Sequence, residues 1–392
     1  MVESTRTLVD ILPHLFMQGT IMNKKEIAEI RKQLQPVRQT ISRIAGCYVS
    51  AEKEKITTFS ESFALLEEEE VFKYLEIFRK SLSGTVGKNL LSMEFPDEEE
   101  EEGGRQHFLY QLRQSHLEDE DLLERFYDKV IGSYVTGENY LILLIANAYD
   151  IPGRGTDQIE MHDASLEVYD YFQAVICPVD LSKPALSYDR GSASFRARIR
   201  DWIVGMPVLG LLFPAFTERG NDIHSCLYYS KDPEDLHFDF TDSVLGCAAP
   251  LSAGEQREAF AQIIEQSLGE RCDFETVKEI HEALLERKEE YEEDPDSDSL
   301  GLHDVRVILS RAGVAEDTLE SLEEVYGENI GDSTILASNV RAKAKFEVHT
   351  PDVTITVRPD RADLVETREI DGRRCLVIPI TDEVTVNGIR VR

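Results

Sequence analysis

Three side chains that could carry out chemistry occupy alternate positions in an apolar part of the sequence. They are Asp222, His224 and Cys226, and in an extended strand all three would point to one side of a sheet. A carboxylate, an imidazole and a thiol on one face could bind zinc or form a Cys–His pair that the aspartate orients. No second ligand cluster with metal spacing lies nearby, although folding could bring His237 close. The structural alternative is a turn aspartate, a hydrogen-bonded histidine and a buried thiol, and the sequence leaves both open.

A second candidate site consists of three arginines. Arg196, Arg198 and Arg200 alternate with apolar residues, so a strand would place three guanidinium groups on one face. Such a face could bind a phosphate or an acidic peptide, because guanidinium groups match paired oxygens. In a chain with 75 acidic residues, pairing with carboxylates across the strand is the structural alternative. The only tryptophan, Trp202, is expected in the core.

Familiar catalytic and cofactor motifs are missing from the sequence. The stretch from Gly84 to Asn89 has two residues between its glycines, whereas a phosphate-binding Walker loop needs four and then Ser or Thr after the lysine. His281-Glu282 lacks the second histidine of a metalloprotease helix, and no nucleophile elbow, dinucleotide fingerprint, calcium loop or zinc ribbon is present. We therefore predict no cofactor, and the missing motifs favour a protein that is not an enzyme.

The net charge of the chain limits the classes of partner that it can bind. Its 392 residues carry a formal net charge of −33, which repels phosphate backbones and anionic lipid surfaces. A membrane partner is not expected, and nucleic acid is disfavoured. A protein partner fits better, and the sequence does not indicate a small-molecule ligand. The last fifty residues differ, since 341–392 contain 10 Lys and Arg against 9 Asp and Glu, or +1, leaving −34 for the first 340.

Cysteines and the N-terminus bear on the cellular compartment. Six cysteines are spread without any paired motif, which is typical of reduced thiols in a cytoplasmic protein. Asn23 and Glu26 form a capping box directly after Met22. We expect translation to begin naturally at Met22, with residues 1–21 as a non-native or disordered extension.

The elements that must position these residues are organised around a central sheet. Four apolar segments between Glu138 and Tyr229 read as strands separated by turn residues. Amphipathic helices precede and follow them, and Ser252 with Glu255 forms a second capping box ahead of one that follows. The sequence therefore predicts an α+β protein in which helices flank a mixed or antiparallel sheet, with a small antiparallel β unit at the C-terminus. The four predicted strands are Tyr140–Ala146, Tyr169–Val179, Val208–Phe216 and Ser225–Ser230.

The predicted segments follow from shifts in composition along the chain. The acidic run 97–102 is expected to be a solvated loop, and 185–202 a hairpin. The full division places a mainly helical region with a short strand pair at 22–135, the sheet and following helices at 136–292, an acidic linker at 293–300, a helix pair at 301–340 and the C-terminal β unit at 341–392.

Several short stretches along the whole length resemble one known family. They include Met22-Asn-Lys-Lys-Glu-Ile, Ile176-Cys-Pro-Val-Asp-Leu, Arg198-Ile-Arg-Asp-Trp, His224-Ser-Cys-Leu-Tyr-Tyr and Thr350-Pro-Asp-Val. The family is the bacterial domain of unknown function 4317. The resemblance implies a bacterial cytoplasmic protein and supplies no activity, substrate or cofactor for any position. In outline, the order of segments is also similar to that of bacterial nucleoid-associated proteins.

Three hypotheses about function remain open. The working hypothesis is a non-catalytic interaction protein, in which the Arg196, Arg198 and Arg200 face or the C-terminal unit docks a macromolecule. The second is a metal- or thiol-dependent hydrolase that uses Asp222, His224 and Cys226. The third is a nucleoid-associated protein.

Overall fold

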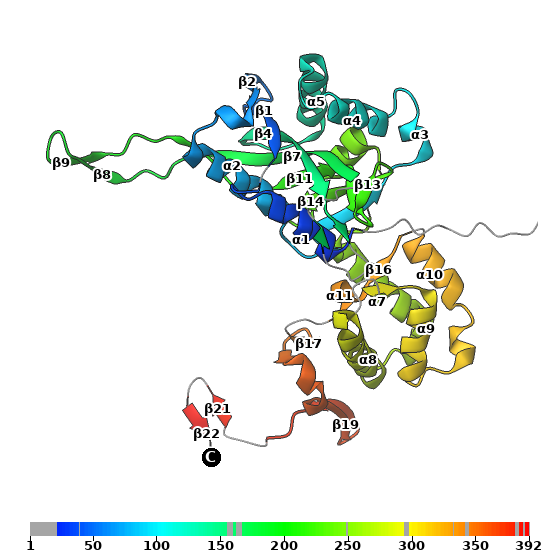
Figure 1. The fold of residues 1–392 in the computed structure, drawn as a ribbon. Helices are drawn as coiled ribbons and strands as arrows, with labels where there is room; N and C mark the ends of the chain where they lie inside the picture. The colour runs from blue at the N-terminus through cyan, green and yellow to red at the C-terminus, as the bar shows by residue number, and fades with distance from the viewer. Residues whose placement is uncertain are drawn as a thin grey trace, which may run out of the picture. The chain divides into compact units, whose positions relative to one another are not determined.

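The computed structural model describes residues 22–38, 40–154, 160–161, 167–247, 250–293, 298–331, 333–341, 345–380, 384–386 and 389–391. The described chain forms two compact units (Figure 1). The first unit comprises the described residues of Met1–Leu82, Ser92–Tyr228 and Asp242–Ala248. The second unit comprises those of Ser83–Leu91, Tyr229–Thr241 and Ala249–Arg392. The predicted α+β class is confirmed.

The first unit is built on an eight-stranded sheet. Its strand order is β2-β1-β4-β7-β11-β14-β3, with β10 pairing with β7 beside this path. The pairs β1–β2, β1–β4, β4–β7, β7–β11 and β7–β10 are all antiparallel. The strands are β1 (Ile41–Val49), β2 (Lys55–Ser62), β3 (Leu90–Glu94), β4 (Asn139–Ile151), β7 (Glu167–Leu181), β10 (Trp202–Val204), β11 (Leu209–Phe213) and β14 (Ser225–Ser230).

The two longest strands, β4 and β7, form the centre of the sheet and confirm the predicted strand positions. They pair in register from Asn139↔Val179 to Ile151↔Glu167. Residues 140–147 of β4 are buried without interruption. An uncharged run of this kind is buried because both faces of the strand are covered.

Helices cover both faces of the sheet. Gln173 and Phe172 are neighbours on β7, so their side chains point to opposite faces. Gln173 is fully buried and donates hydrogen bonds to the Phe78 carbonyl oxygen (2.9 Å) and to Ser81 Oγ (2.7 Å) at the end of α2. Phe172 lies edge-on against Phe126 of α5, with ring centroids 6.4 Å apart. The helices of this unit are α1 (Lys24–Gln33), α2 (Glu68–Ser81), α3 (Asp97–Glu100), α4 (Arg105–Gln114) and α5 (Glu120–Ser133), with the short helices η1 (Phe63–Leu65) and η2 (Thr241–Leu245).

A local signal in the sequence explains where α1 begins, and a contact with α4 explains why one predicted loop is a helix. The capping box of Asn23 and Glu26 is present at the start of α1. The acidic run predicted to be a loop instead forms one turn of helix, α3. The prediction was wrong because Glu99 accepts hydrogen bonds from the backbone and side chain of Arg105, which holds the turn against α4.

A long hairpin projects from the sheet (Figure 1). Its strands β8 (Leu186–Asp189) and β9 (Ser194–Ala197) pair antiparallel and continue the chain between β7 and β10. We call residues 182–201 the arm. The predicted hairpin is confirmed, but the core position expected for Trp202 is wrong, because the tryptophan begins β10 at the base of the arm and is 56% exposed.

Small elements complete the first unit. The strands β12 (Ala215–Thr217) and β13 (Gly220–Asp222) form a hairpin directly before β14. β5 (Gly153–Arg154) pairs with β6 (Glu160–Met161). No helix among the described residues is both long and apolar enough to cross a membrane.

The second unit is helical around one core. The capping box of Ser252 and Glu255 starts α7 as predicted, and the helices of this unit pack Ile263, Leu284 and Ile308 into a common cluster. The cluster also contains Leu300, so the predicted linker 293–300 ends inside a core. The helices are α6 (Phe238–Phe240), α7 (Ala253–Leu268), η3 (Gly269–Arg271), α8 (Phe274–Glu293), α9 (Leu302–Arg311), η5 (Glu316–Leu319), α10 (Leu322–Ile330), α11 (Ala337–Val340) and η6 (Pro359–Leu364).

Antiparallel hairpins follow the helices, as the sequence predicts. Asp371 and Gly372 make the tight turn of the second one, and Asn387-Gly388 lies outside the described residues between two paired strands. The hairpins are β17 (Phe346–His349) with β18 (Thr354–Val357), β19 (Glu366–Ile370) with β20 (Arg373–Val377), and β21 (Val384–Val386) with β22 (Ile389–Val391). Earlier in the chain, β15 (Ser299–Leu300) before α9 pairs antiparallel with β16 (Ile335–Leu336) after α10.

Candidate functional site

Asp222 ends β13 and uses its carboxylate to hold the turn into β14. Its Oδ1 accepts a hydrogen bond from the His224 backbone N–H (3.1 Å), and its Oδ2 accepts hydrogen bonds from the hydroxyls of Ser225 and Thr217. Both oxygens are therefore engaged locally. This arrangement matches the structural alternative, an aspartate that stabilises a turn.

His224 lies on the surface of the same turn. Its side chain is 69% exposed, and its Nδ1–H donates to the Glu100 carboxylate, with Nδ1 2.8 Å from Oε1. The hydrogen bond to Glu100 raises the pKa of His224 above its ordinary value, because the charged imidazolium is favoured beside a carboxylate. The orienting carboxylate is thus Glu100 of α3 and not Asp222.

Cys226 is enclosed in the sheet. Its side chain has no exposed surface, and burial raises the pKa of its thiol well above the ordinary value, with a further contribution from the adjacent Cys247 thiol. A thiol held in the neutral form is a poor nucleophile and a poor metal ligand. The structure therefore gives Asp222, His224 and Cys226 three separate environments.

Metal binding was the other use suggested for these residues. Among the described residues, no three His, Cys, Asp or Glu side chains gather in a way that could hold a metal ion. His237 lies beside Asp235, with Nε2 3.8 Å from Oδ2. All six cysteines are free thiols, and four of them are buried.

The three arginines do not form one guanidinium face. Arg196 is the only one inside β9, and its Nε lies 3.3 Å from Asp189 Oδ2, across the hairpin. Arg200 donates from Nε to the Ser182 carbonyl oxygen (2.6 Å), at the base of the arm. The backbone N–H of Arg198 donates to the Ala185 carbonyl oxygen (2.8 Å), and its side chain is exposed. Two of the three thus brace the arm itself.

The most unusual surface of the arm is apolar. In the β8–β9 register, Leu186 faces Ala197 and Tyr188 faces Phe195, so these four side chains share one face of the ribbon. Leu186 is 73% exposed, Tyr188 57% and Phe195 71%. The Tyr188 and Phe195 rings lie 5.5 Å apart and contact each other. We call Leu186, Tyr188, Phe195 and Ala197 the apolar face.

The opposite face of the same ribbon is polar. It carries Ser187, Asp189, Ser194 and Arg196, which alternate with the apolar residues along each strand. The sequence pattern drew attention to the arginines and not to the apolar face. Alternation alone is visible in the sequence, but it does not say which side of a hairpin other elements will cover.

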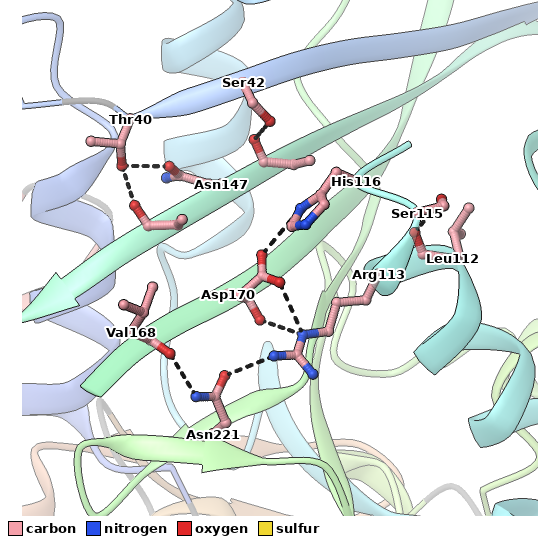
Figure 2. Close-up of polar contacts among 12 residues, drawn as sticks. Thr40, Ser42, Leu112, Arg113, Ser115, His116, Asn147, Val168, Asp170 and Asn221 are labelled. Carbon is pink, nitrogen blue, oxygen red and sulfur yellow. Dashed lines mark hydrogen bonds and ion pairs between the residues drawn. The ribbon is translucent and has the colours of Figure 1, made fainter. Parts of the chain in front are cut away.

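A polar cluster at the end of α4 has no counterpart among the sequence predictions. Figure 2 shows Asp170 of β7 between Arg113 and His116. Arg113 Nε donates to the Asp170 carbonyl oxygen (2.6 Å), and His116 Nδ1 lies 3.6 Å from Asp170 Oδ1. Arg113 also donates to Asn221 Oδ1 (3.4 Å), while Asn221 donates to the Val168 carbonyl oxygen (2.9 Å).

This cluster pairs a histidine with a carboxylate, as general bases often do. The adjacent Ser115 hydroxyl, however, donates to the Leu112 carbonyl oxygen (2.8 Å), so it is not turned toward the imidazole. Arg113 and Asp170 are 57 residues apart in sequence, which is why no local motif indicated them. The contacts tie α4 to β7 and β13.

Comparison with known proteins assigns the chain to a family. The family described as "Domain of unknown function (DUF4317)" matches residues 22–389. The chain belongs to this family. The match confirms the resemblance drawn from short stretches of sequence, and membership of the DUF4317 family brings no activity, ligand or partner. Among curated proteins, none matches the chain.

Proposed function

We propose that this protein acts in the bacterial cytoplasm by binding another protein, without catalysis, and that its arm is the docking element. The observation that supports this is the apolar face. Three large apolar side chains that are more than half exposed on one side of a two-stranded ribbon expose surface that a monomer ordinarily buries. The six free thiols fit a reducing compartment.

The architecture of the arm favours a docking role over a structural one. A two-stranded ribbon has no second layer of its own and is marginally stable in isolation. The Arg196–Asp189 pair and the hydrogen bonds of Arg200 keep this ribbon formed while its apolar face stays uncovered within the first unit. A rigid ribbon loses little conformational freedom on binding, so more of the contact energy appears as affinity.

A shortened arm provides the test. The backbone N–H of Arg198 already bonds to the Ala185 carbonyl oxygen, so replacing residues 186–197 by Asn-Gly should close a two-residue hairpin turn. The shortened protein should keep its melting temperature, because the removed side chains contribute nothing to the core. The tagged full-length and shortened proteins would then be isolated from the native cell after cross-linking. The proteins recovered with each of them would be compared.

We expect at least one stoichiometric partner to be lost with the shortened arm. The matched control is the double variant Ser187→Glu and Ser194→Glu, which alters only the polar face and should keep the partner. Identical sets of partners for the full and shortened chains would sink the proposal, as would turnover of a substrate that disappears in His224→Ala.

Nucleoid association has one specific observation in its favour. The arm contains five Lys or Arg and two Asp, a net charge of +3, which leaves −36 for the rest of the chain. Retention of duplex DNA that falls steeply with salt and requires the arm would support this alternative over a protein partner. The large negative remainder and the internal use of Arg196 and Arg200 weigh against it.

A further inference from the structure

A pocket in the first unit is lined by helices α3, α4 and α5. Its volume is about 670 Å³, and its walls come mostly from α3, the turn that follows it, the first residue of α4 and the C-terminal half of α5. Lys129 of α5 lines this pocket together with Arg105 and Glu99, and the lysine is half-buried. Its amine is therefore partly shielded from water and is still within reach of a small molecule.

The amine of Lys129 is not paired with a carboxylate. Among the residues that the structure describes, Lys129 forms no ion pair. Helix α5 also carries Glu124 and Asp128, but both bind Lys55 of β2, whose Nζ lies 2.8 Å from Asp128 Oδ1. The Lys129 ammonium thus lacks the close contact that would favour its charged form.

Two guanidinium groups lie near the same amine. Arg125 precedes Lys129 by one helical turn, and both cations lie over the Phe108 ring, with Arg125 Cζ 4.9 Å and Lys129 Nζ 5.6 Å from its centroid. Like charges at this spacing destabilise each other, and a guanidinium keeps its charge, so only the lysine can relieve the repulsion by losing a proton. Partial burial lowers the pKa of Lys129, and Arg105 and Arg125 lower it further, while Glu99 acts in the opposite direction.

We infer that Lys129 is a site of covalent modification, at which the side-chain amine forms an imine with a small, uncharged aldehyde. The unprotonated amine attacks the carbonyl carbon, and the carbonyl oxygen takes up a proton to give a carbinolamine. The nitrogen then loses its remaining proton and the carbon loses its hydroxyl group, which together leave as water, and a C=N bond forms. The reaction consumes no oxidant or reductant. It does not involve the arm, so it is independent of the proposed function.

The charge of the pocket selects among carbonyl compounds. Carboxylates line most of the wall around Lys129, and they repel anionic reagents such as acyl phosphates and keto acids. An uncharged aldehyde meets no such repulsion, and the pocket has room for it. The acidic residues of the wall are Glu98, Glu99, Glu101, Glu102 and Asp128.

The test is competitive labelling of the full-length protein with limiting acetaldehyde and sodium cyanoborohydride at about pH 7. Cyanoborohydride transfers a hydride to the imine carbon and water supplies a proton, so each adduct becomes a stable ethyl-lysine that peptide mass spectrometry locates. We expect Lys129 to be ethylated at least about fivefold faster than Lys55 and Lys73. Partial burial lowers the pKa of Lys55, but hydrogen bonds to Asp128 and Glu124 outweigh it and raise that pKa. Lys73 controls for access, because its side chain is 79% exposed.

A variant measures the contribution of the neighbouring guanidinium. Arg125→Gln should slow the ethylation of Lys129 at least about twofold, because a larger fraction of the amine is then protonated. The matched control Arg43→Gln also removes one guanidinium, which pairs with Glu118 and not with the pocket, and should leave the rate at Lys129 unchanged.

Two results would overturn the inference. The first is ethylation of Lys129 no faster than that of Lys55 or Lys73, and this comparison uses the unaltered chain, so it does not depend on whether a variant folds. The second is an unchanged rate at Lys129 in folded Arg125→Gln, because the guanidinium would then not activate the amine. Either result leaves the recovery of a partner through the arm unaffected.

Discussion

At the scale of single residues, most of the side chains that suggested chemistry are buried or hydrogen-bonded to nearby residues. Asp222 stabilises a turn, Arg200 donates a hydrogen bond to the Ser182 carbonyl oxygen and Cys226 is buried in the sheet. A polar side chain in a fold with many backbone turns is more often needed for those turns than for a reaction. The same residue types therefore look alike in sequence whether they serve folding or catalysis.

The role of Asp222 can be measured through stability. Asp222→Ala removes the acceptor for one backbone N–H and two hydroxyls, so we expect a loss of about 2 kcal/mol in the free energy of unfolding. His224→Ala should change it by less than about 0.5 kcal/mol, because the histidine side chain is 69% exposed. Urea denaturation of both variants gives the comparison. Equal losses would show that the imidazole has a structural role comparable to that of the carboxylate.

His281 of α8 makes stability depend on pH. Burial lowers its pKa below the ordinary value of 6.5, and its Nδ1 has no hydrogen-bond partner among the described residues. The unfolded state therefore binds the proton more readily than the folded state. The contribution of His281 to the free energy of unfolding is fully present above pH 6.5 and is lost as the pH falls below that value.

The measurement is the urea midpoint at about pH 8 and about pH 5.5 for the unaltered protein and for His281→Phe. The ring of His281 lies edge-on against Phe346, with centroids 6.0 Å apart, so phenylalanine can keep that contact. We expect the difference between the two midpoints to shrink in the variant. An undiminished difference would assign the pH dependence to other groups.

At the scale of elements, the stretch that resembles a phosphate loop is a packing element of the second unit. Gly87 has φ +76°, and a Cβ at this position would lie 2.0 Å from Leu336 Cδ1. Its carbonyl oxygen accepts a hydrogen bond from Asn339 Nδ2 (3.1 Å). The glycine is needed because Leu336 and the chain approach each other closely, and no phosphate has to be invoked.

Two glycines with nearly the same positive φ allow the cost of backbone strain to be measured separately from the cost of side-chain crowding. Gly313 has φ +77°, and a Cβ added there would meet no described atom within 4 Å, whereas Gly87 is crowded. Gly313→Ala should therefore cost about 1 kcal/mol through the left-handed backbone alone, and Gly87→Ala about 3 kcal/mol. Thermal or urea unfolding of the two variants checks the difference. Similar costs would mean that Leu336 moves aside easily.

The elements themselves were largely predictable from the sequence. Uncharged runs located β4 and β7, and the capping boxes at Asn23 and Ser252 located two helix starts, because these signals are local. Exposure was not predictable in the same way. Trp202 looks like a core residue by type, yet whether it is covered depends on where a hairpin projects. The contact of Arg113 with Asp170 depends on packing between distant segments and leaves no local pattern.

At the scale of the whole molecule, the two units are not consecutive pieces of chain. Residues 83–91 and 229–241 belong to the second unit although first-unit segments flank them. The core of the second unit also draws Leu284 and Ile308 from either side of the predicted acidic linker. A cut in that linker would divide one core, so division by composition alone does not find separable domains here.

The net charge of −33 should make stability sensitive to salt. Self-repulsion destabilises a compact acidic chain, and dissolved ions screen it. Raising sodium chloride from about 20 to about 200 mM should increase the melting temperature by a few degrees. Differential scanning calorimetry measures this shift. A lower melting temperature in salt would instead mean that ion pairs such as Arg219–Glu29 outweigh the repulsion.

The turn at the far end of the arm has a practical consequence. Asp189 accepts hydrogen bonds from the Gly191 N–H (2.9 Å) and the Ser192 hydroxyl (2.8 Å), so the turn is held by its own residues. A short epitope inserted after Ser192 would be displayed far from the sheet without entering its folding. An antibody against that epitope would then report, in fixed and permeabilised cells, whether the end of the ribbon is covered or free.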